Sequence, residues 1–555
     1  MKNILLSGLC LVFALSISAQ EADFEAPINP DFLKYQKNIY ENKIPAFSEL
    51  GHPLNEIPLY VKPDFTNYLK QQENKSVMFD AVYDMRNHGL LTSVKNQGNC
   101  GACWTFASIG SLESYSIKTG FGTFNFSEQN VRTCHGFYLD PASGTCSGGN
   151  PKKSAAYFTR GDGPVLETAD PYNTNSQQTC NTTLTPAANV NNFCILPGTQ
   201  NVIKQALLDY GALYTNMMYS SAYLNSSNNT YFYAGTEGTN HAVLLAGWDD
   251  NKVTAGGTGA WIIKNSYGTS WGENGYFYVS YNDSAILTTN AYFPSIGNYD
   301  AYEEIYMYDE LGWISNIGYT SEVAYGLIKF IAGSNEKITK VGTYINSAGA
   351  SISFEIYDTK TDNTLSGLLA SVPEQQCAWP GYHTFSLPQQ INISSGNDFY
   401  IKVRYNTPGY NYPLPIERLS TDYAEPQIAD GVCWASSSGT TWTAYGASQA
   451  GKERDLCIRA YTLPQGTDEK LLLSKTETVE VFPNPAQNAF TIKSDVGAII
   501  KIEMMNSEGK LVSKIEPDQQ NTKFEFNTSA LSSGVYFLRI VTKNNTYFRK
   551  ITLIE

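Results

Sequence analysis

The sequence predicts a multidomain fold in which a mixed α+β domain is followed by two all-β domains. At about 150 residues per domain, the 555 residues would make roughly three to four domains. A hydrophobic fraction of 42% excludes a generally disordered chain, because it supplies enough apolar surface for several cores. Charged residues make up 16% and aromatic residues 13%, a composition that favours β structure over long solvent-facing helices.

The first 78 residues predict two segments that precede the folded domains. Residues 1–19 have the pattern of a secretory signal peptide, with an apolar run from Ile4 to Ala14 and cleavage expected after Ala19. Residues 20–78 show no sustained periodicity and predict an extended leader rather than a domain. Since no later stretch approaches 18 apolar residues, we expect an exported protein without an integral membrane segment.

The charge balance argues against a nucleic-acid partner. Asp and Glu number 52 against 38 Lys and Arg, and no basic run appears. The resulting formal net charge of -14 indicates only that the protein is soluble.

Residues 79–296 mix helix and strand patterns, as expected for an α+β domain. Apolar residues at helical spacing predict helices over 104–119 and 201–210, each followed by a terminating glycine. Apolar runs predict three strands, and a glycine-rich stretch turns the first back on the second. The strands are expected over 242–246, 260–264 and 276–280, with the turn over 255–259.

Beyond residue 297 the helical signals fade. Short alternating runs separated by turn residues, such as 351–357, predict a β-sandwich over 297–463. A polar linker over 464–476 then leads to a last unit over 477–555, which is also β in pattern.

The cysteine count points to one reactive thiol. One of the ten cysteines lies in the signal peptide, so nine remain, which suggests pairs plus a free thiol in an exported protein. Cys103 lies at the start of the predicted helix over 104–119, where unpaired N–H groups and the helix dipole favour a thiolate. The alternative is that Cys103 is one half of a structural disulfide.

Only one of the five histidines suits a base for such a thiol. His52 lies in the leader and His383 in the β region. His88 and His135 lie in polar, loop-like contexts. His241 begins an apolar strand, and the next strand ends just before Asn265. A hairpin would bring Asn265 beside His241, where its side-chain oxygen could accept the imidazole N–H. Alone, His241 would be a packed strand residue, but with Cys103 and Asn265 it indicates nucleophilic catalysis.

The string Cys100-Gly-Ala-Cys103-Trp104 resembles the active-site signature of the papain family of cysteine peptidases. His241 follows Cys103 by 138 residues and Asn265 follows His241 by 24, spacings that are similar to those of the family. The resemblance covers about residues 83–281 and implies a helical left half and a β-barrel-like right half.

The resemblance implies a role for each matching residue. Cys103 would be the nucleophile, His241 the general acid and base, and Asn265 the residue that orients His241. The Gln97 amide and the Cys103 backbone N–H would form the oxyanion hole. The implied substrate-binding residues are Gly148 and Gly149, which would pair with the substrate backbone, Trp271, which would wall the leaving-group side, and the neighbouring Tyr267 and Asn240.

Some positions depart from the commonest family pattern. Tyr267 stands where a Trp usually covers the Asn–His hydrogen bond, and Asn240 stands where some members have Asp. Asn150 replaces an aromatic residue that is common in the substrate cleft. The family also suggests disulfides Cys100–Cys146 and Cys134–Cys180, which leaves four further cysteines unassigned: Cys194, Cys377, Cys433 and Cys457.

The implied function is that of an exported cysteine endopeptidase, made as a zymogen, that hydrolyses peptide bonds through a thioester acyl-enzyme. Its partners would be protein or peptide substrates, and nothing in the sequence indicates a metal or organic cofactor. Exopeptidase activity would need a cleft-blocking insertion, and none is evident. The leader, residues 20–78, would be the propeptide, with an N-terminal extension that is never removed as the alternative.

The segments after the peptidase region carry resemblances of their own. Residues 297–463 resemble the lectin-like β-sandwich of some prokaryotic peptidases. Its aromatics could stack on sugars, although strand aromatics more often pack within the fold, so glycan binding is the lesser interpretation; the candidates are Trp379, Tyr410 and Trp434. Residues 477–555 resemble the C-terminal sorting domain of type IX secretion, which implies that machinery as a partner and a secreted or outer-surface location.

Two other functions compete with the peptidase hypothesis. One is a surface adhesin or glycan-binding protein with a vestigial peptidase fold, against which the intact Cys103, His241, Asn265 and Gln97 argue. The other is acyl transfer by the same residues, such as transpeptidation, which would need an acceptor site for an amine.

Overall fold

The computed structural model describes residues 22–41, 46–72, 77–465, 479–494, 497–506, 511–517, 521–529, 531–542 and 546–554. The predicted signal peptide and most of the predicted linker lie outside these residues. The chain divides into two compact units, and the second contains everything from Pro464 onward. Among the described residues, no helix combines the length and the apolar character needed to cross a membrane.

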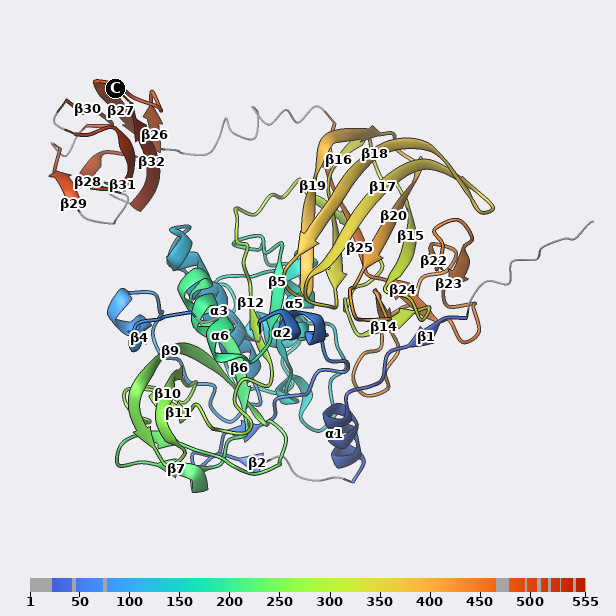
Figure 1. Ribbon diagram of the computed structural model, residues 1–555, viewed down its shortest axis with the longest axis horizontal. Helices are drawn as coiled ribbons and strands as arrows, with labels where there is room; N and C mark the ends of the chain where they lie inside the picture. Colours follow the sequence, from blue (N-terminus) through green and yellow to red (C-terminus); the bar gives the residue numbers. More distant parts are fainter. Residues whose placement is uncertain are drawn as a thin grey trace, which may run out of the picture. The chain divides into compact units, whose positions relative to one another are not determined.

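The leader is more structured than the sequence predicts. It is drawn in blue in Figure 1 and contains helices and short strands. Asn29 caps the first helix by accepting the N–H of Asp31 at 3.1 Å, and Pro30 occupies its first turn. Phe32 is the only buried residue of that helix, so the sequence has no apolar stripe to predict it. The elements are β1 (Phe24–Glu25), α1 (Pro30–Tyr40), β2 (Ala46–Phe47), β3 (Pro53–Leu54) and α2 (Thr66–Gln72).

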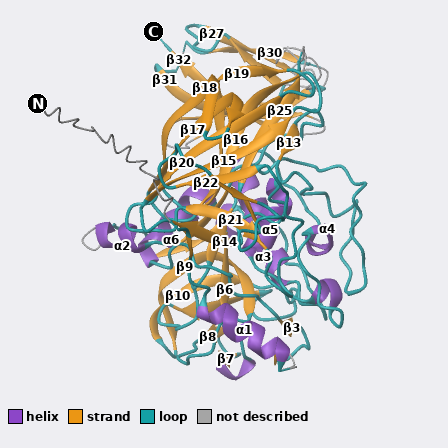
Figure 2. Cartoon of the chain, turned by 90° about the vertical axis from the view of Figure 1, so that its right-hand side faces the viewer, coloured by secondary structure: helices purple, strands orange, loops and turns teal. Residues whose placement is uncertain are grey.

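The α+β region has its helices beside a strongly bent, mostly antiparallel sheet (Figures 1 and 2). Both predicted helices are present, as α3 (Cys103–Thr119) and α6 (Gln200–Tyr210), and the other two are α4 (Glu128–Cys134) and α5 (Pro151–Thr159). The strands are β4 (Val82–Asp84), β5 (Phe193–Leu196), β6 (Leu213–Met217), β7 (Leu224–Asn225), β8 (Thr230–Tyr231), β9 (His241–Thr254), β10 (Gly257–Lys264), β11 (Tyr276–Ser280) and β12 (Asn290–Tyr292).

The hairpin of β9 and β10 positions the site. Lys264 pairs with Leu244, so the last residue of β10 lies near the first residues of β9. Strand β9 runs to Thr254, eight residues beyond the predicted end, because its polar half continues the hairpin past the buried sheet. The turn is accordingly tighter than expected, since Thr254 pairs directly with Gly257.

The β-sandwich follows as two large sheets around one apolar core, with a smaller third sheet of order β1-β14-β21-β24 packed on the same core. One sheet has the order β18-β17-β20-β15-β22-β23, and the other contains β13, β25, β16 and β19. The strands are β13 (Glu304–Tyr306), β14 (Ser315–Gly318), β15 (Val323–Ile331), β16 (Glu336–Ile345), β17 (Ala350–Thr361), β18 (Thr364–Cys377), β19 (Gly381–Ile393), β20 (Asp398–Asn406), β21 (Leu414–Arg418), β22 (Cys433–Ser436), β23 (Thr443–Tyr445), β24 (Arg454–Leu456) and β25 (Ile458–Pro464).

The α+β region and the sandwich are joined by a shared sheet. Strand β19 pairs with β5 through Gly381 and Tyr382, so one sheet runs continuously from the sandwich into the α+β region. The leader also joins the sandwich, because β1 pairs with β14. These segments therefore form one compact unit.

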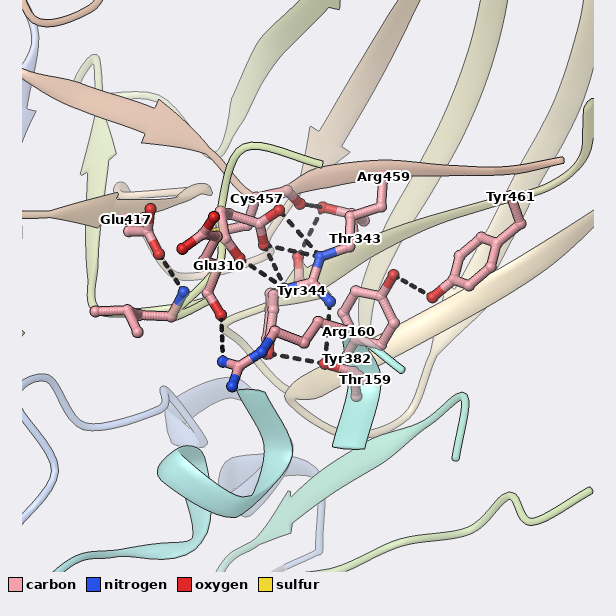
Figure 3. Close-up of polar contacts among 12 residues, drawn as sticks. Thr159, Arg160, Glu310, Thr343, Tyr344, Tyr382, Glu417, Cys457, Arg459 and Tyr461 are labelled. Carbon is pink, nitrogen blue, oxygen red and sulfur yellow. Dashed lines mark hydrogen bonds and ion pairs between the residues drawn. The ribbon is translucent and has the colours of Figure 1, made fainter. Parts of the chain in front are cut away.

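A buried ion pair lies at the junction between the two regions (Figure 3). Arg459 of β25 contacts Asp309 at 2.9 Å, and both side chains are fully buried. Arg459 also donates to the hydroxyl of Thr159, at the end of α5, at 3.1 Å. Nearby, Arg160 donates to the carbonyl oxygen of Glu310 at 3.0 Å. Since Thr159 and Arg160 belong to the α+β region, these contacts hold it on the sandwich.

The C-terminal unit is a small all-β fold around its own apolar core. It consists of a three-stranded sheet, β26-β27-β30, and a four-stranded sheet, β29-β28-β31-β32. The strands are β26 (Val479–Phe482), β27 (Ala489–Ser494), β28 (Ile499–Asn506), β29 (Leu511–Ile515), β30 (Lys523–Asn527), β31 (Gly534–Thr542) and β32 (Thr546–Leu553).

Candidate active site

Cys103 is the first residue of α3 and is completely buried. Its Sγ accepts a hydrogen bond from the backbone N–H of Ala242, at 3.5 Å. Ala242 is the second residue of β9, so the thiol lies against the start of the strand that His241 begins. The thiol is free rather than disulfide-bonded.

His241 and Asn265 are brought together by the hairpin of β9 and β10. The ring Nε2 of His241 lies 2.8 Å from Oδ1 of Asn265, and both residues are buried. The same Oδ1 accepts the backbone N–H of Ser266 at 2.9 Å, which fixes the orientation of the amide. Since a carbonyl oxygen only accepts, Nε2 must carry the proton. The basic nitrogen is therefore Nδ1, which has no hydrogen-bond partner among the described residues.

Gln97 lies in the loop before α3 and is fully buried. Its Oε1 accepts the hydroxyl of Ser266 at 2.6 Å, and its Nε2 donates to the carbonyl oxygen of Cys100 at 3.0 Å. Its backbone N–H donates to the carbonyl oxygen of Ser266 at 2.9 Å. These contacts fix the side chain, and the second N–H of its amide has no partner among the described residues.

Tyr267 and Trp271 form an aromatic wall next to His241. The rings of Tyr267 and His241 are 5.1 Å apart and nearly parallel, at 29°. The ring of Trp271 packs edge-on against Tyr267 at 5.4 Å. Tyr267 thus covers His241, although it is smaller than the Trp of the commoner pattern. The side-chain amide of Asn240 is instead engaged by the backbone of Tyr219, from which it accepts one hydrogen bond and to which it donates another.

Gly148 and Gly149 have no room for a side chain, because the leader approaches the first and an indole the second. Gly148 has a φ of +90°, and a Cβ there would lie 1.9 Å from the carbonyl oxygen of Asn55. A Cβ at Gly149 would lie 2.4 Å from the indole of Trp104. Both positions therefore need glycine.

Two disulfides brace this region. Cys100–Cys146 ties the loop before α3 to the loop that carries Gly148, and Cys134–Cys180 ties the end of α4 to the following segment. Of the described cysteines outside these bonds, four besides Cys103 are buried free thiols: Cys194, Cys377, Cys433 and Cys457.

The leader runs through the site on both sides of Cys103. On the Trp271 side, the Glu49 carboxylate accepts the indole N–H of Trp271 at 2.7 Å and the hydroxyl of Tyr219 at 2.9 Å. The ring of His52 packs edge-on against Tyr267, at 4.3 Å. These contacts anchor the leader beside His241.

On the other side, the leader pairs with the glycine loop. Glu56 forms a parallel bridge with Gly149, and the N–H of Ile57 donates to the carbonyl oxygen of Gly149 at 2.8 Å. The N–H of Glu56 donates to the carbonyl oxygen of Asn240 at 3.0 Å. The Asn55 amide donates to a carbonyl in the same loop at 2.9 Å. Residues 49–57 thus cover the site, which explains why Cys103 has no exposed surface.

Burial under the leader decides the protonation of the site. Burial raises the pKa of the Cys103 thiol to about 12, although the N–H of Ala242 lowers it in part. Burial lowers the pKa of His241 to about 4, against a smaller opposing effect of its bond to Asn265. The helix N-terminus was expected to favour a thiolate, but in this covered form desolvation dominates and both groups are neutral.

The sequence did not predict the residues that cover the site. His52 lies in a leader without sustained periodicity, and nothing in the sequence distinguishes Glu49 or Glu56 from other leader carboxyls. The sequence does not indicate the role of Ser266 either, which fixes Gln97 and directly follows Asn265.

The aromatics considered for glycan stacking pack within the fold. Trp379 lies edge-on against Tyr68 of the leader at 4.6 Å. The hydroxyl of Tyr410 accepts an amide N–H of Asn316 at 3.0 Å. Trp434 lies under the Lys360 ammonium at 4.4 Å. Each of the three is thus engaged in the fold.

Three family models match the chain. The model described as papain family cysteine protease matches residues 79–295, and a lectin-like domain model matches 305–462. A secretion system C-terminal sorting domain model matches 480–554.

Curated relatives match the peptidase region. A probable cysteine protease of Arabidopsis thaliana is 31% identical, over 35% of this chain and 54% of its own length. Cathepsin K of Mus musculus is 31% identical, over 38% of this chain and 64% of its own length. The chain thus spans between about half and two thirds of these relatives.

A solved structure matches both domains of the first unit. It is the crystal structure of the cysteine protease and lectin-like domains of Cwp84, a surface layer associated protein of Clostridium difficile. The TM-score is 0.67 at 22% identity, over 80% of this chain and 99% of that one, which shows a shared fold. This confirms the predicted fold class. Residues 79–295 belong to the papain family of cysteine proteases, and they are followed by a lectin-like domain and a secretion-system sorting domain.

Proposed function

We propose that the protein is an exported cysteine endopeptidase, made in a latent form, that uses Cys103, His241 and Asn265. One observation carries the proposal. Nε2 of His241 is bound to Asn265, while its basic Nδ1 is unpartnered in the buried site that holds the free Cys103 thiol. This arrangement suits proton transfer from a thiol to an oriented imidazole.

Removal of residues 49–57 would start the reaction by admitting water. Hydration would lower the pKa of Cys103 and raise that of His241, because the burial that shifts both would be relieved. The thiol proton would then pass to Nδ1 of His241. Asn265 would hold the imidazolium through its bond to Nε2.

The thiolate would attack the peptide carbonyl and form a tetrahedral intermediate. The unpartnered amide N–H of Gln97 and the backbone N–H of Cys103 would stabilise its oxyanion, at about 3 kcal/mol per donor. His241 would give its proton to the leaving amine, which leaves a thioester on Cys103. Water activated by His241 would hydrolyse that thioester.

The path of the leader supports endopeptidase activity, in which a substrate polypeptide is cut at an internal bond. It passes from Trp271 to Gly149 without ending, so a substrate could extend on both sides of Cys103. The same path supports latency, because the leader fills the site and leaves Cys103 without exposed surface. A similar protein, a clostridial cysteine protease with 24% identity and a TM-score of 0.61, has been solved after propeptide cleavage.

The sorting-domain match supports a secreted or cell-surface location, with the secretion machinery as partner of the C-terminal unit. The matched structure comes from a surface layer associated protein, which agrees with such a location.

Thiol labelling combined with peptide hydrolysis tests this function. The processed protein should be treated with a thiol alkylator, the modified cysteine mapped, and fluorogenic peptides assayed under reducing conditions. We expect labelling at Cys103 and hydrolysis that Cys103→Ala abolishes, while Cys194→Ala, which alters another buried free thiol, retains it. An unlabelled Cys103 together with no cleavage would refute the peptidase assignment.

A further inference from the structure

The side chain of Glu56 occupies a pocket beside the catalytic residues. Its Oε2 accepts the hydroxyl of Thr239 at 2.8 Å, and its Oε1 accepts an amide N–H of Asn216 at 3.3 Å. Its backbone pairs with Gly149 and with Asn240, the residue before His241. Trp271 lies at the other end of the leader's path, so the pocket is on the acyl side of Cys103.

The orientation of Asn216 makes the pocket a fixed hydrogen-bond donor. Its Oδ1 accepts the backbone N–H of Thr289 at 2.8 Å, so the amide cannot be flipped without losing that bond. One N–H of its Nδ2 goes to Thr239 at 3.1 Å, and the other points at Glu56. When the leader leaves, this buried amide loses an acceptor.

Among the described residues that line the pocket, no cation is free to pair with a guest carboxylate. Lys62, on the leader, is paired with Asp31 at 2.9 Å, and Lys34 with Glu237 at 3.1 Å. The Glu56 carboxyl is accordingly protonated at neutral pH, because burial raises its pKa to about 8. The pocket therefore suits a neutral side chain that has a carbonyl oxygen. The hydroxyl of Thr239 can also accept an N–H from such a side chain.

We propose that this pocket selects substrates that carry glutamine on the acyl side of the scissile bond, at the residue whose backbone pairs with Gly149. The glutamine oxygen would accept from Asn216, and its amide would donate to Thr239. Glutamate would enter as the protonated acid and be favoured only at low pH. Leucine or phenylalanine would leave the buried amide of Asn216 unpaired, a loss that makes polar pockets selective. This inference rests on the proposed peptidase function.

A set of matched fluorogenic peptides tests the proposal. The processed protein, with active sites counted by Cys103 alkylation, would be given peptides that differ only in Gln, Glu, Leu or Phe, placed at each acyl-side position in turn. At one position, kcat/KM for Gln should exceed that for Leu by about ten- to a hundredfold. Glu should approach Gln only as the pH falls.

Two variants locate the preference. Thr239→Val keeps the shape but removes the hydroxyl, and it should lower the Gln-to-Leu ratio about tenfold. Thr258→Val, an exposed change at the turn of the β9–β10 hairpin, should leave the ratio unchanged. Full titration of Cys103 with Leu cleaved as well as Gln at every position would overturn the pocket assignment and leave the peptidase function intact. No titration and no cleavage would overturn both.

Discussion

Replacing Glu56 by Gln should remove a pH dependence from the docking of the leader. The Glu56 carboxyl is fully buried in the docked leader, where burial raises its pKa from 4.5 to about 8. The docked form therefore binds a proton that the released form loses above its own pKa. Docking is strongest at low pH and weakens as the pH rises from 4.5 toward 8.

The size of the effect follows from the two pKa values. Docking weakens by about 1.4 kcal/mol per pH unit between them. From pH 5 to pH 7.5 the loss is about 3 kcal/mol, or about a two-hundredfold rise in the open fraction. The ionisable groups that influence Glu56 offer no positive charge to reduce this: Asp31, Tyr35, Cys103, Tyr214 and Tyr423.

The rate of Cys103 alkylation on the intact chain measures the open fraction, because the covered thiol is completely buried. The intrinsic titration of the thiol and of His241 contributes equally to wild type and Glu56→Gln, so the ratio of their rates isolates Glu56. We expect that ratio to rise about two-hundredfold from pH 5 to pH 7.5. Glu41→Gln, an exposed change at the end of α1, serves as control. A ratio that stays flat over this range would refute the reasoning.

Three further changes test the site and the domain junction. Asn265→Ala removes the acceptor of His241 and should lower kcat/KM of the processed protein about ten- to a hundredfold in the peptide assay; an unchanged value would contradict the orienting role. Gln97→Ala should lower kcat by roughly a hundred- to a thousandfold with little effect on KM, and a change in KM alone would argue against an oxyanion donor. Asp309→Ala leaves the buried Arg459 charge unpaired and should lower the free energy of unfolding in urea by about 3–5 kcal/mol. The α+β region and the sandwich should unfold in one shared transition, and separate transitions for these two would show that they unfold independently.

Local sequence pattern predicts where the three candidate catalytic residues lie. Cys103, His241 and Asn265 lie at the ends of elements with clear patterns: an apolar helix and two strands joined by a glycine-rich turn. A hairpin fixes the distance between its own strand ends, so the neighbourhood of His241 and Asn265 followed from local pattern alone.

The remaining features depend on contacts between distant segments. Gly381 and Tyr382 pair with β5, from which they are separated by nearly two hundred residues of sequence. The pattern of neither strand predicts which strand it will pair with. Glu56 resembles any leader carboxyl until the chain places it against Asn216. The neutral state of Cys103 likewise arises from the leader above it rather than from the helix below it.

Asn150 links helix α5 to the sandwich. Its Oδ1 caps α5 by accepting the N–H of Lys152 at 3.1 Å, and its Nδ2 donates to the hydroxyl of Tyr423 at 3.0 Å. Tyr423 belongs to the sandwich, and its ring packs edge-on against Phe32 of the leader at 4.9 Å. An aromatic side chain of the sandwich thus contacts both position 150 and the leader. With the sheet that β5 shares with β19, this contact packs the sandwich against the α+β region within one compact unit.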